Sequence, residues 1–306
     1  MSLYGIFKRN GKNGFGYNTT AEMVTEGLNL AGKTILVTGC NSGIGRESAL
    51  VLARRGATII GTARTLEKAE EVCKTLGNDS FGLACELSDP KNIRECLAKL
   101  KKAVQKINVV IGNAGIMALP RLTQIHGYEL QFFTNHIGHF ILINGLLDTM
   151  TPDGRIVMVS SDAHKMAPAD TIEFDNLDGK KKYKPWKAYG QSKMANILFV
   201  KELSRRLIKT GITVNALHPG VIQTNLWRHM NPVINGLFSF FGKLALKSIS
   251  QGAATTCYAA VHPDMKNISG QYLADCNVTS SRPDSNDAEL AAKLWKKSEE
   301  IVSVFK

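Results

Sequence analysis

Residues 34–53 read Thr-Ile-Leu-Val-Thr-Gly-Cys-Asn-Ser-Gly-Ile-Gly-Arg-Glu-Ser-Ala-Leu-Val-Leu-Ala, and this stretch decides the fold. It begins with the apolar run Ile35–Val37, which is typical of a strand buried on both faces of a parallel sheet. Gly39, Gly43 and Gly45 then form a turn, and after them apolar residues recur at helical spacing. A glycine turn at a helix N-terminus directs unpaired backbone N–H groups and the positive end of the helix dipole at one point. The stretch therefore predicts a site for the pyrophosphate of a dinucleotide.

Strand and helix patterns alternate from Lys33 onward without a linker or an internal repeat. Besides the first strand, apolar runs predict strands at 57–63, 80–87, 107–112, 153–161, 212–218 and 270–274. This alternation predicts an α/β fold: a Rossmann-type doubly wound parallel sheet of about seven strands, with helices on both faces in three α/β/α layers. We expect residues 31–306 to form a single domain. Residues 1–30 are expected to be an extension packed on it, with a disordered tail as the alternative.

The composition is that of an ordinary globular protein, because 44% of the 306 residues are hydrophobic and 21% are charged. No apolar stretch reaches the roughly 18 residues that a membrane span needs, and the first residues lack the apolar core of a secretory signal. Six cysteines are scattered without disulfide-like or metal-ligand spacing, which indicates free thiols and no metal site. We predict a cytoplasmic protein, with peripheral contact to a membrane as the alternative.

The formal net charge of +12 raises the question of a nucleic-acid partner. The one dense basic cluster consists of Lys180, Lys181, Lys182, Lys184 and Lys187. No helix-turn-helix, zinc-finger or aromatic RNA-binding pattern accompanies this cluster, so we predict a solvated basic loop and no nucleic-acid partner. Attraction to an anionic membrane surface or to an acidic cofactor is the alternative.

The glycine spacing of the opening stretch differs from the common dinucleotide fingerprint Gly-x-Gly-x-x-Gly and resembles the signature of the short-chain dehydrogenase/reductase family. Four further motifs resemble that family in chain order: Asn113-Ala114-Gly115, Asn135-x-x-Gly138-x-Phe140, Ser161 at a strand end, and Tyr189-x-x-x-Lys193. The resemblance covers roughly residues 31–280. Within the family, the chain looks most like the retinol-dehydrogenase and WW-domain-oxidoreductase relatives and the chloroplast translocon-associated reductases.

The resemblance implies a nicotinamide dinucleotide cofactor. Ala63 stands where NAD-type members carry Asp, and the basic Arg64 that follows favours the 2′-phosphate of NADP(H), with Arg46 as a second charge nearby. If Arg64 faces solvent instead, NAD(H) is the alternative. Glu86 departs from the Asp that the family carries at the adenine. The expected cofactor-binding residues are Gly39, Asn41, Ser42, Gly43, Ile44, Gly45, Arg64, Glu86, Leu87, Asn113, Ala114, Gly115, Tyr189, Lys193, Ile222 and Thr224.

The resemblance also implies four catalytic residues: Asn135, Ser161, Tyr189 and Lys193. Ser161 is expected to bind the substrate oxygen, with Ser160 as the alternative, and Tyr189 to act as general acid and base. Because Tyr189 and Lys193 stand at i and i+4, they share one face of a helix. We expect the lysine ammonium to lower the pKa of the phenol from its ordinary value of about 10. Asn135 is expected to hold the water of a proton relay.

Two further segments carry expectations about the site. Residues 128–147 are expected to form one long helix, in which His136 and His139 are structural rather than metal-binding. Residues 225–250 are rich in large apolar side chains and are expected to form a lid over a lipophilic substrate, with burial in the core as the alternative. The lysines of this segment would also suit a membrane surface.

We therefore predict an NADP(H)-dependent oxidoreductase. It would transfer a hydride between the nicotinamide and a carbonyl, or a primary or secondary alcohol, of a retinoid-, aldehyde- or ketone-like substrate. An NADP(H)-binding regulatory or scaffold protein with little turnover is one alternative, and a sugar-nucleotide epimerase or dehydratase is another. The resemblance implies a homodimer or homotetramer, although relatives with hydrophobic additions can be monomeric or membrane-associated.

Overall fold

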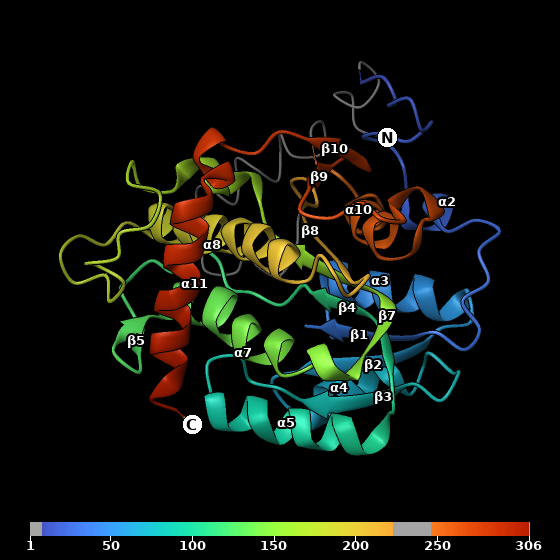
Figure 1. The fold of residues 1–306 in the computed structure, drawn as a ribbon. Coiled ribbons are helices and arrows are strands. Elements are labelled where there is room, and N and C mark those ends of the chain that lie inside the picture. Colours follow the sequence, from blue (N-terminus) through green and yellow to red (C-terminus); the bar gives the residue numbers. More distant parts are fainter. Residues whose placement is uncertain (1–7, 223–245, 306) are drawn as a thin grey trace.

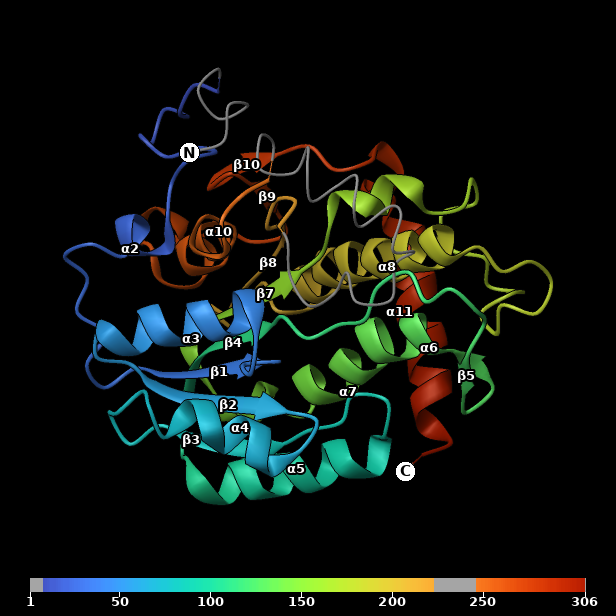
Figure 2. The same ribbon diagram turned by 180° about the vertical axis from the view of Figure 1, so that it is seen from behind.

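The computed structural model describes residues 8–222 and 246–305, which form an eight-stranded sheet between two layers of helices (Figures 1 and 2). The strands are β1 (Thr34–Thr38), β2 (Thr58–Ala63), β3 (Phe81–Ala84), β4 (Ile107–Gly112), β7 (Met150–Val159), β8 (Thr213–His218), β9 (Tyr272–Ala274) and β10 (Asn277–Thr279). Neighbours are parallel in the order β3-β2-β1-β4-β7-β8-β9. The chain builds outward from β1 on one side and from β4 on the other, and ligands bind such sheets where the two directions part.

Both faces of the sheet are buried because successive side chains of each strand point to opposite sides. In β1, Ile35 and Val37 join one apolar cluster, and Leu36 joins the other. The first cluster is covered by α3 (Gly43–Arg54), α4 (Leu66–Cys73) and α10 (Ile249–Val261). The second is covered by α5 (Pro90–Ala103), α7 (Gly138–Asn144), α8 (Pro185–Arg206) and α11 (Ala288–Ser303). The doubly wound three-layer fold that the sequence predicts is thereby confirmed.

The eighth strand was not predicted. β10 pairs antiparallel with β9 through a two-residue turn, Asp275 and Cys276, and both turn residues have positive φ angles of 50° and 61°. Hairpin turns of this kind favour Asn-Gly or Asp-Gly, and a cysteine at the second position hides the signal. The strand expected at 153–161 begins earlier, at Met150, and ends at Val159, so that both serines lie just beyond its end.

The expectation of one helix over 128–147 is wrong. Residues 128 and 129 form the short strand β6 (Tyr128–Glu129), paired with β5 (Gln124–Ile125), and the Glu129 carboxylate then caps α6 (Leu130–Phe132). A π-helical turn, η1 (Phe133–Ile137), follows and leads into α7. At the start of α7 a Cβ on Gly138 would lie 2.2 Å from the carbonyl oxygen of Leu87, so only glycine permits this approach. Isolated π turns are often found at functional sites.

Residues 8–30 lie against the domain (Figures 1 and 2). The short helix α2 (Ala21–Val24) contacts α3 and α10, and Glu22 forms ion pairs with Arg54 and Arg55. Asn13 donates a hydrogen bond to the carbonyl oxygen of Cys276, 2.8 Å away. Within the described ranges, no helix has both the length and the apolar character needed to cross a bilayer.

Candidate active site

A cavity of about 270 Å³ lies at the carboxyl ends of β1, β2, β3 and β4. Eleven of the residues expected to bind the cofactor line it: Gly39, Asn41, Ser42, Gly43, Ile44, Arg64, Glu86, Leu87, Asn113, Ala114 and Gly115. Ala63 lines it as well, and five further lining residues were not singled out from the sequence: Cys85, Ser88, Ile116, Leu130 and Thr134. Four of these five directly precede or follow a motif residue, and Leu130 is the exception. Position after a strand end is the one signal that could have indicated Cys85 and Ser88.

The glycine turn is tightly packed. Gly39 has a φ of 67°, a left-handed conformation that favours glycine. A Cβ on Gly45 would lie 2.3 Å from the carbonyl oxygen of Gly39 and 2.4 Å from Nδ2 of Asn113. Ser42 at the N-cap of α3 makes no side-chain capping bond, so the N–H groups of the first turn stay available to a ligand anion. The turn can therefore cradle a phosphate.

Thr38 at the end of β1 connects the turn to the loop after β4. Its Oγ1 accepts hydrogen bonds from the backbone N–H groups of Asn113 and Ala114, at 2.8 and 2.9 Å. The Asn113 amide donates in return to the Thr38 carbonyl oxygen at 2.8 Å. These bonds explain the Asn-Ala-Gly motif physically, because its asparagine ties two neighbouring strands at the cavity wall.

At the far end of the cavity, Arg64 is exposed, and no carboxylate of the described residues forms an ion pair with it. Glu86, in contrast, has hydrogen-bond partners: its Oε1 accepts from the N–H and the hydroxyl of Ser88, at 3.1 and 2.9 Å. Arg46 is exposed on α3 but is not among the residues that line the cavity. Arg64 is thus the basic side chain at this end of the cavity.

Tyr189 and Lys193 lie on one face of α8, as their spacing predicts, and both side chains are buried. Lys193 Nζ donates a hydrogen bond to the carbonyl oxygen of Val159 at 2.9 Å. The side chain of Ser161, just after β7, lies close enough to the Tyr189 hydroxyl to hold down its pKa. The alternative serine, Ser160, donates instead to the Lys193 carbonyl oxygen at 2.7 Å and is buried. The geometry therefore places Ser161, not Ser160, beside the phenol.

The structure corrects the expected pKa of Tyr189. Burial raises the pKa of this phenol to about 12, and the hydrogen bond with Ser161 is what opposes the rise. Lys193 does not lower it in the protein alone, because the ammonium is bound at Val159 and lies 5.7 Å from the centre of the phenol ring. Burial also lowers the pKa of Lys193 to about 8. Tyr189 consequently keeps its proton at neutral pH.

Asn135 lies within the π turn and is fully buried. Its amide nitrogen donates to the carbonyl oxygen of Ile116 and to Oγ of Ser192, and its Oδ1 accepts from the Ile116 N–H, all at 2.9 Å. Asn135 therefore joins the cavity wall at Ile116 to α8 through Ser192.

His139, which the sequence predicts to be structural rather than metal-binding, makes two hydrogen bonds through its ring. Its Nδ1 donates to the carbonyl oxygen of Asn135 at 3.0 Å, and its Nε2 lies 3.0 Å from Oγ1 of Thr38. Burial lowers the pKa of His139 to about 4 and that of His136 to about 3, so both rings are neutral at pH 7. His139 therefore links the π turn to the strand that leads into the glycine turn.

Four of the expected cofactor-binding residues are not among those that line the cavity: Gly45, Tyr189, Lys193 and Ile222. Ile222 is buried and pairs with Lys247 in a single parallel bridge. Thr224 lies outside the described residues, as does the lid segment up to residue 245.

Apolar side chains surround Tyr189. Met117, Ala118 and Ala163 pack against it, and the Trp186 ring meets the phenol edge-on with centroids 6.1 Å apart. Trp186 is 38% exposed, so part of its ring is available to a ligand. The reactive hydroxyl groups thus adjoin an apolar surface.

The chain is similar to proteins of one family. Residues 33–234 match the model described as short chain dehydrogenase. "Short-chain dehydrogenase TIC 32 A, chloroplastic" of Brassica napus is 42% identical over 312 residues, which cover 96% of this chain and 97% of that protein. Human "Retinol dehydrogenase 13" is 40% identical over 291 residues, covering 90% of this chain and 86% of that one.

The fold is also similar to that of a solved reductase structure. The structure of angucycline C-6 ketoreductase LanV with bound NADP superimposes with a TM-score of 0.67 at 25% identity, over 80% of this chain and 95% of that one. The similarity therefore extends over the cavity and over the elements that carry Ser161 and Tyr189.

Proposed function

Since the chain belongs to the short-chain dehydrogenase family of oxidoreductases, we propose that it is an NADP(H)-dependent enzyme that interconverts carbonyl and alcohol groups of a lipophilic small molecule. The observation that carries the proposal is that the side chain of Ser161 acts on the Tyr189 hydroxyl, with Lys193 one helical turn from Tyr189. Two hydroxyl groups that lie together can converge on one carbonyl oxygen, which is what proton transfer to that oxygen requires.

The cavity is suited to a nicotinamide dinucleotide. Its glycine turn and uncapped α3 can hold a pyrophosphate, and Arg64 has no carboxylate partner among the described residues. An arginine there forms charge-assisted hydrogen bonds with a 2′-phosphate, which supports NADP(H) over NAD(H). When bound, the nicotinamide supplies or accepts the hydride.

Each of the four expected catalytic residues has a proposed task. Tyr189 holds the proton on its hydroxyl and gives it to the substrate oxygen during reduction, while Ser161 donates a second hydrogen bond to that oxygen. Lys193 Nζ lies 5.7 Å from the centre of the phenol ring, and its positive charge is proposed to stabilise the phenolate once the nucleotide is bound. Asn135 keeps the loop at Ile116 in place and holds a relay water.

The proposed substrate class rests on the apolar surface beside Tyr189 and on the name of the human relative, retinol dehydrogenase 13. Retinoid-like aldehydes and other lipophilic aldehydes or ketones match that surface. The Brassica napus relative is named as chloroplastic, so the cytoplasmic location stays a prediction, as does the homodimer or homotetramer.

The test measures NADPH consumption with all-trans-retinal and a panel of lipophilic aldehydes and ketones, for wild type and Tyr189→Phe. We expect turnover in the wild type and a loss of about a hundredfold or more in kcat for the variant, with NADPH affinity unchanged. Binding of NADPH without turnover of any panel member would favour the regulatory or scaffold alternative. If neither NADPH nor NADH binds, the proposal fails.

A further inference from the structure

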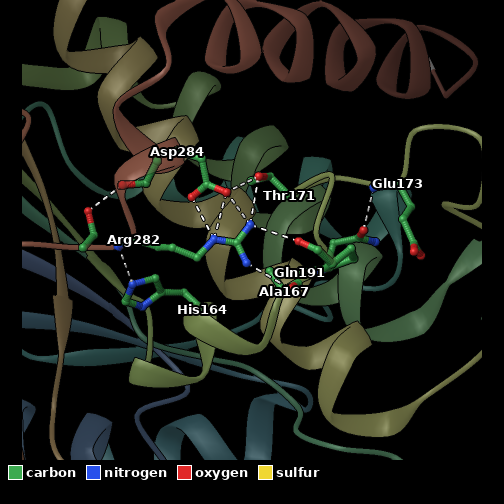
Figure 3. A network of polar contacts seen from close by, with 10 residues as sticks. His164, Ala167, Thr171, Glu173, Gln191, Arg282 and Asp284 are labelled. Atoms are coloured by element: carbon green, nitrogen blue, oxygen red, sulfur yellow. Dashed lines mark hydrogen bonds and ion pairs between the residues drawn. The ribbon is translucent and has the colours of Figure 1, made fainter.

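Arg282, in the segment between β10 and α11, is the centre of a polar network (Figure 3). Its guanidinium pairs with the carboxylate of Asp284 and donates hydrogen bonds to the carbonyl oxygens of Ala167 and Pro168, at 2.9 and 3.0 Å. It also donates to Oγ1 of Thr171 at 2.8 Å. One planar donor group thus clamps the loop that follows Ser161.

The backbone of that loop indicates that the clamp is needed. Thr171 has a φ of 63°, which is a genuine outlier for a β-branched residue. Such a conformation persists only where the surroundings impose it. Here the Thr171 hydroxyl lies between the Arg282 guanidinium, which donates to it, and the Asp284 carboxylate, to which it donates.

His164 is hydrogen-bonded to Arg282 in this clamp (Figure 3) and also contacts Ser161. Its Nε2 accepts a hydrogen bond from the backbone N–H of Arg282 at 3.0 Å, so the ring proton is on Nδ1. Nδ1 lies 2.7 Å from the carbonyl oxygen of Ser161 and donates to it. The ring is fully buried, and no other tautomer satisfies both bonds.

The turn that carries Ser161 is held from a second side as well. In this turn, η3 (Asp162–Met166), the Ala163 N–H donates to Oγ of Ser161 at 3.2 Å. The turn also rests on α8, where a Cβ on Gly190 would lie 2.6 Å from the Ala163 carbonyl oxygen. The turn is therefore packed against α8 at Ala163, while the His164 ring is hydrogen-bonded to the carbonyl oxygen of Ser161.

We propose that His164 and Arg282, which lie 118 positions apart along the chain, are positioning residues that together hold the Ser161 hydroxyl in reach of Tyr189. This inference rests on the proposed role of Ser161. Small displacements matter at such a site, because a misplacement of about 1 Å can lower a rate about a hundredfold.

Three substitutions at His164 separate its two hydrogen bonds. His164→Asn keeps an N–H donor near the position of Nδ1, His164→Gln keeps an acceptor near Nε2, and His164→Phe keeps the ring volume but neither bond. In the NADPH-dependent assay we expect the His164→Phe and His164→Gln variants to have a kcat lowered about tenfold or more. Their affinity for NADPH should stay within about twofold of the wild-type value. His164→Asn is expected to lower kcat by less than His164→Phe, because it keeps the donor to Ser161 and loses only the acceptor that ties the ring to Arg282. If kcat falls as far in His164→Asn as in His164→Phe, the hydrogen bond from residue 164 does not position Ser161, and the inference is overturned.

A double-mutant cycle with Ser161→Ala tests whether His164 acts through the serine. We expect His164→Phe to lower kcat in the wild-type background and to have little further effect once Ser161 is alanine. Independent, multiplicative losses would overturn the inference and leave the proposed function standing. An unchanged kcat for Ser161→Ala alone would instead contradict the proposed role of the serine.

A spectroscopic measurement checks the geometry without turnover. Nitrogen NMR of the imidazole should report a neutral His164 ring protonated at Nδ1. Arg282→Met is expected to release the loop at Ala167 and Thr171, and the shift of the His164 ring should change while that of the exposed His126 does not. An unchanged His164 signal would show that the clamp does not reach the histidine.

Discussion

Asn135 and Lys193 face the same small space beside Gly115. A Cβ on Gly115 would lie 3.0 Å from Oδ1 of Asn135 and 3.4 Å from Nζ of Lys193. Both side chains are buried, and Gly115 also lines the cavity. The space between an amide oxygen and an ammonium is where a relay water would be held, since both groups form hydrogen bonds with water.

Gly115→Ala should fill this space. Since Gly115 does not adopt a positive φ, the added methyl group acts through its volume rather than through backbone strain. We expect kcat to fall about tenfold or more, in a steady-state assay with NADPH and the best panel substrate. Gly145→Ala is the matched control, because the nearest atoms to its Cβ would be those of the Leu97 side chain, at 2.5 Å, and the backbone of α7, all outside the cavity lining. A wild-type kcat for Gly115→Ala would rule out a relay at this position.

Arg64→Ala should change the preference between cofactors. Loss of a charge-assisted contact with the 2′-phosphate is expected to weaken NADPH binding about tenfold or more and to leave NADH binding unchanged. Paired fluorescence titrations of the two nucleotides measure this. Arg46→Ala is the control, and we expect a smaller effect because Arg46 does not line the cavity. If the binding of both nucleotides is weakened equally, Arg64 does not bind the 2′-phosphate.

Trp186→Ala should affect lipophilic substrates selectively. The ring is 38% exposed next to Tyr189, so a long apolar substrate can cover it, whereas a short aldehyde cannot. We expect KM for all-trans-retinal to rise about fivefold or more, with kcat nearly unchanged and KM for propanal unaffected. Met23→Ala removes an exposed apolar side chain on α2 and should change neither value. An equal rise in KM for both aldehydes would contradict an apolar substrate surface at Trp186.

Acid should destabilise the fold through buried histidines. Burial lowers the pKa of His136 to about 3 and the pKa values of His139 and His218 to about 4, from 6.5. Below pH 6.5 the unfolded chain binds protons that the folded protein does not, so the free energy of unfolding falls as the pH drops towards about 4. The expected loss is a few kcal/mol.

Urea unfolding at several pH values measures this loss. His136→Gln removes one of the titrating groups and should flatten the pH dependence, whereas replacement of the exposed His126 by Gln should not. A free energy of unfolding that does not change between pH 7 and pH 4 would contradict the expectation.

The sequence by itself determined the sheet, the glycine turn and the pairing of Tyr189 with Lys193. These features depend on order along the chain and on local periodicity: apolar runs form strands, glycines allow the tight turn, and residues four apart share a helix face. The family motifs identified most of the cavity lining for the same reason, since residues that follow neighbouring parallel strands meet at one edge of the sheet.

Only the tertiary structure decided how the reactive groups are held. It showed that Ser161 rather than Ser160 faces Tyr189, that a π turn interrupts the helix at Asn135, and that Arg282 reaches Ser161 through His164. It also reversed the expected direction of the pKa of Tyr189. Burial and contacts between distant segments control all of these features, and local spacing carries no information about which distant groups meet or how far water is excluded from them.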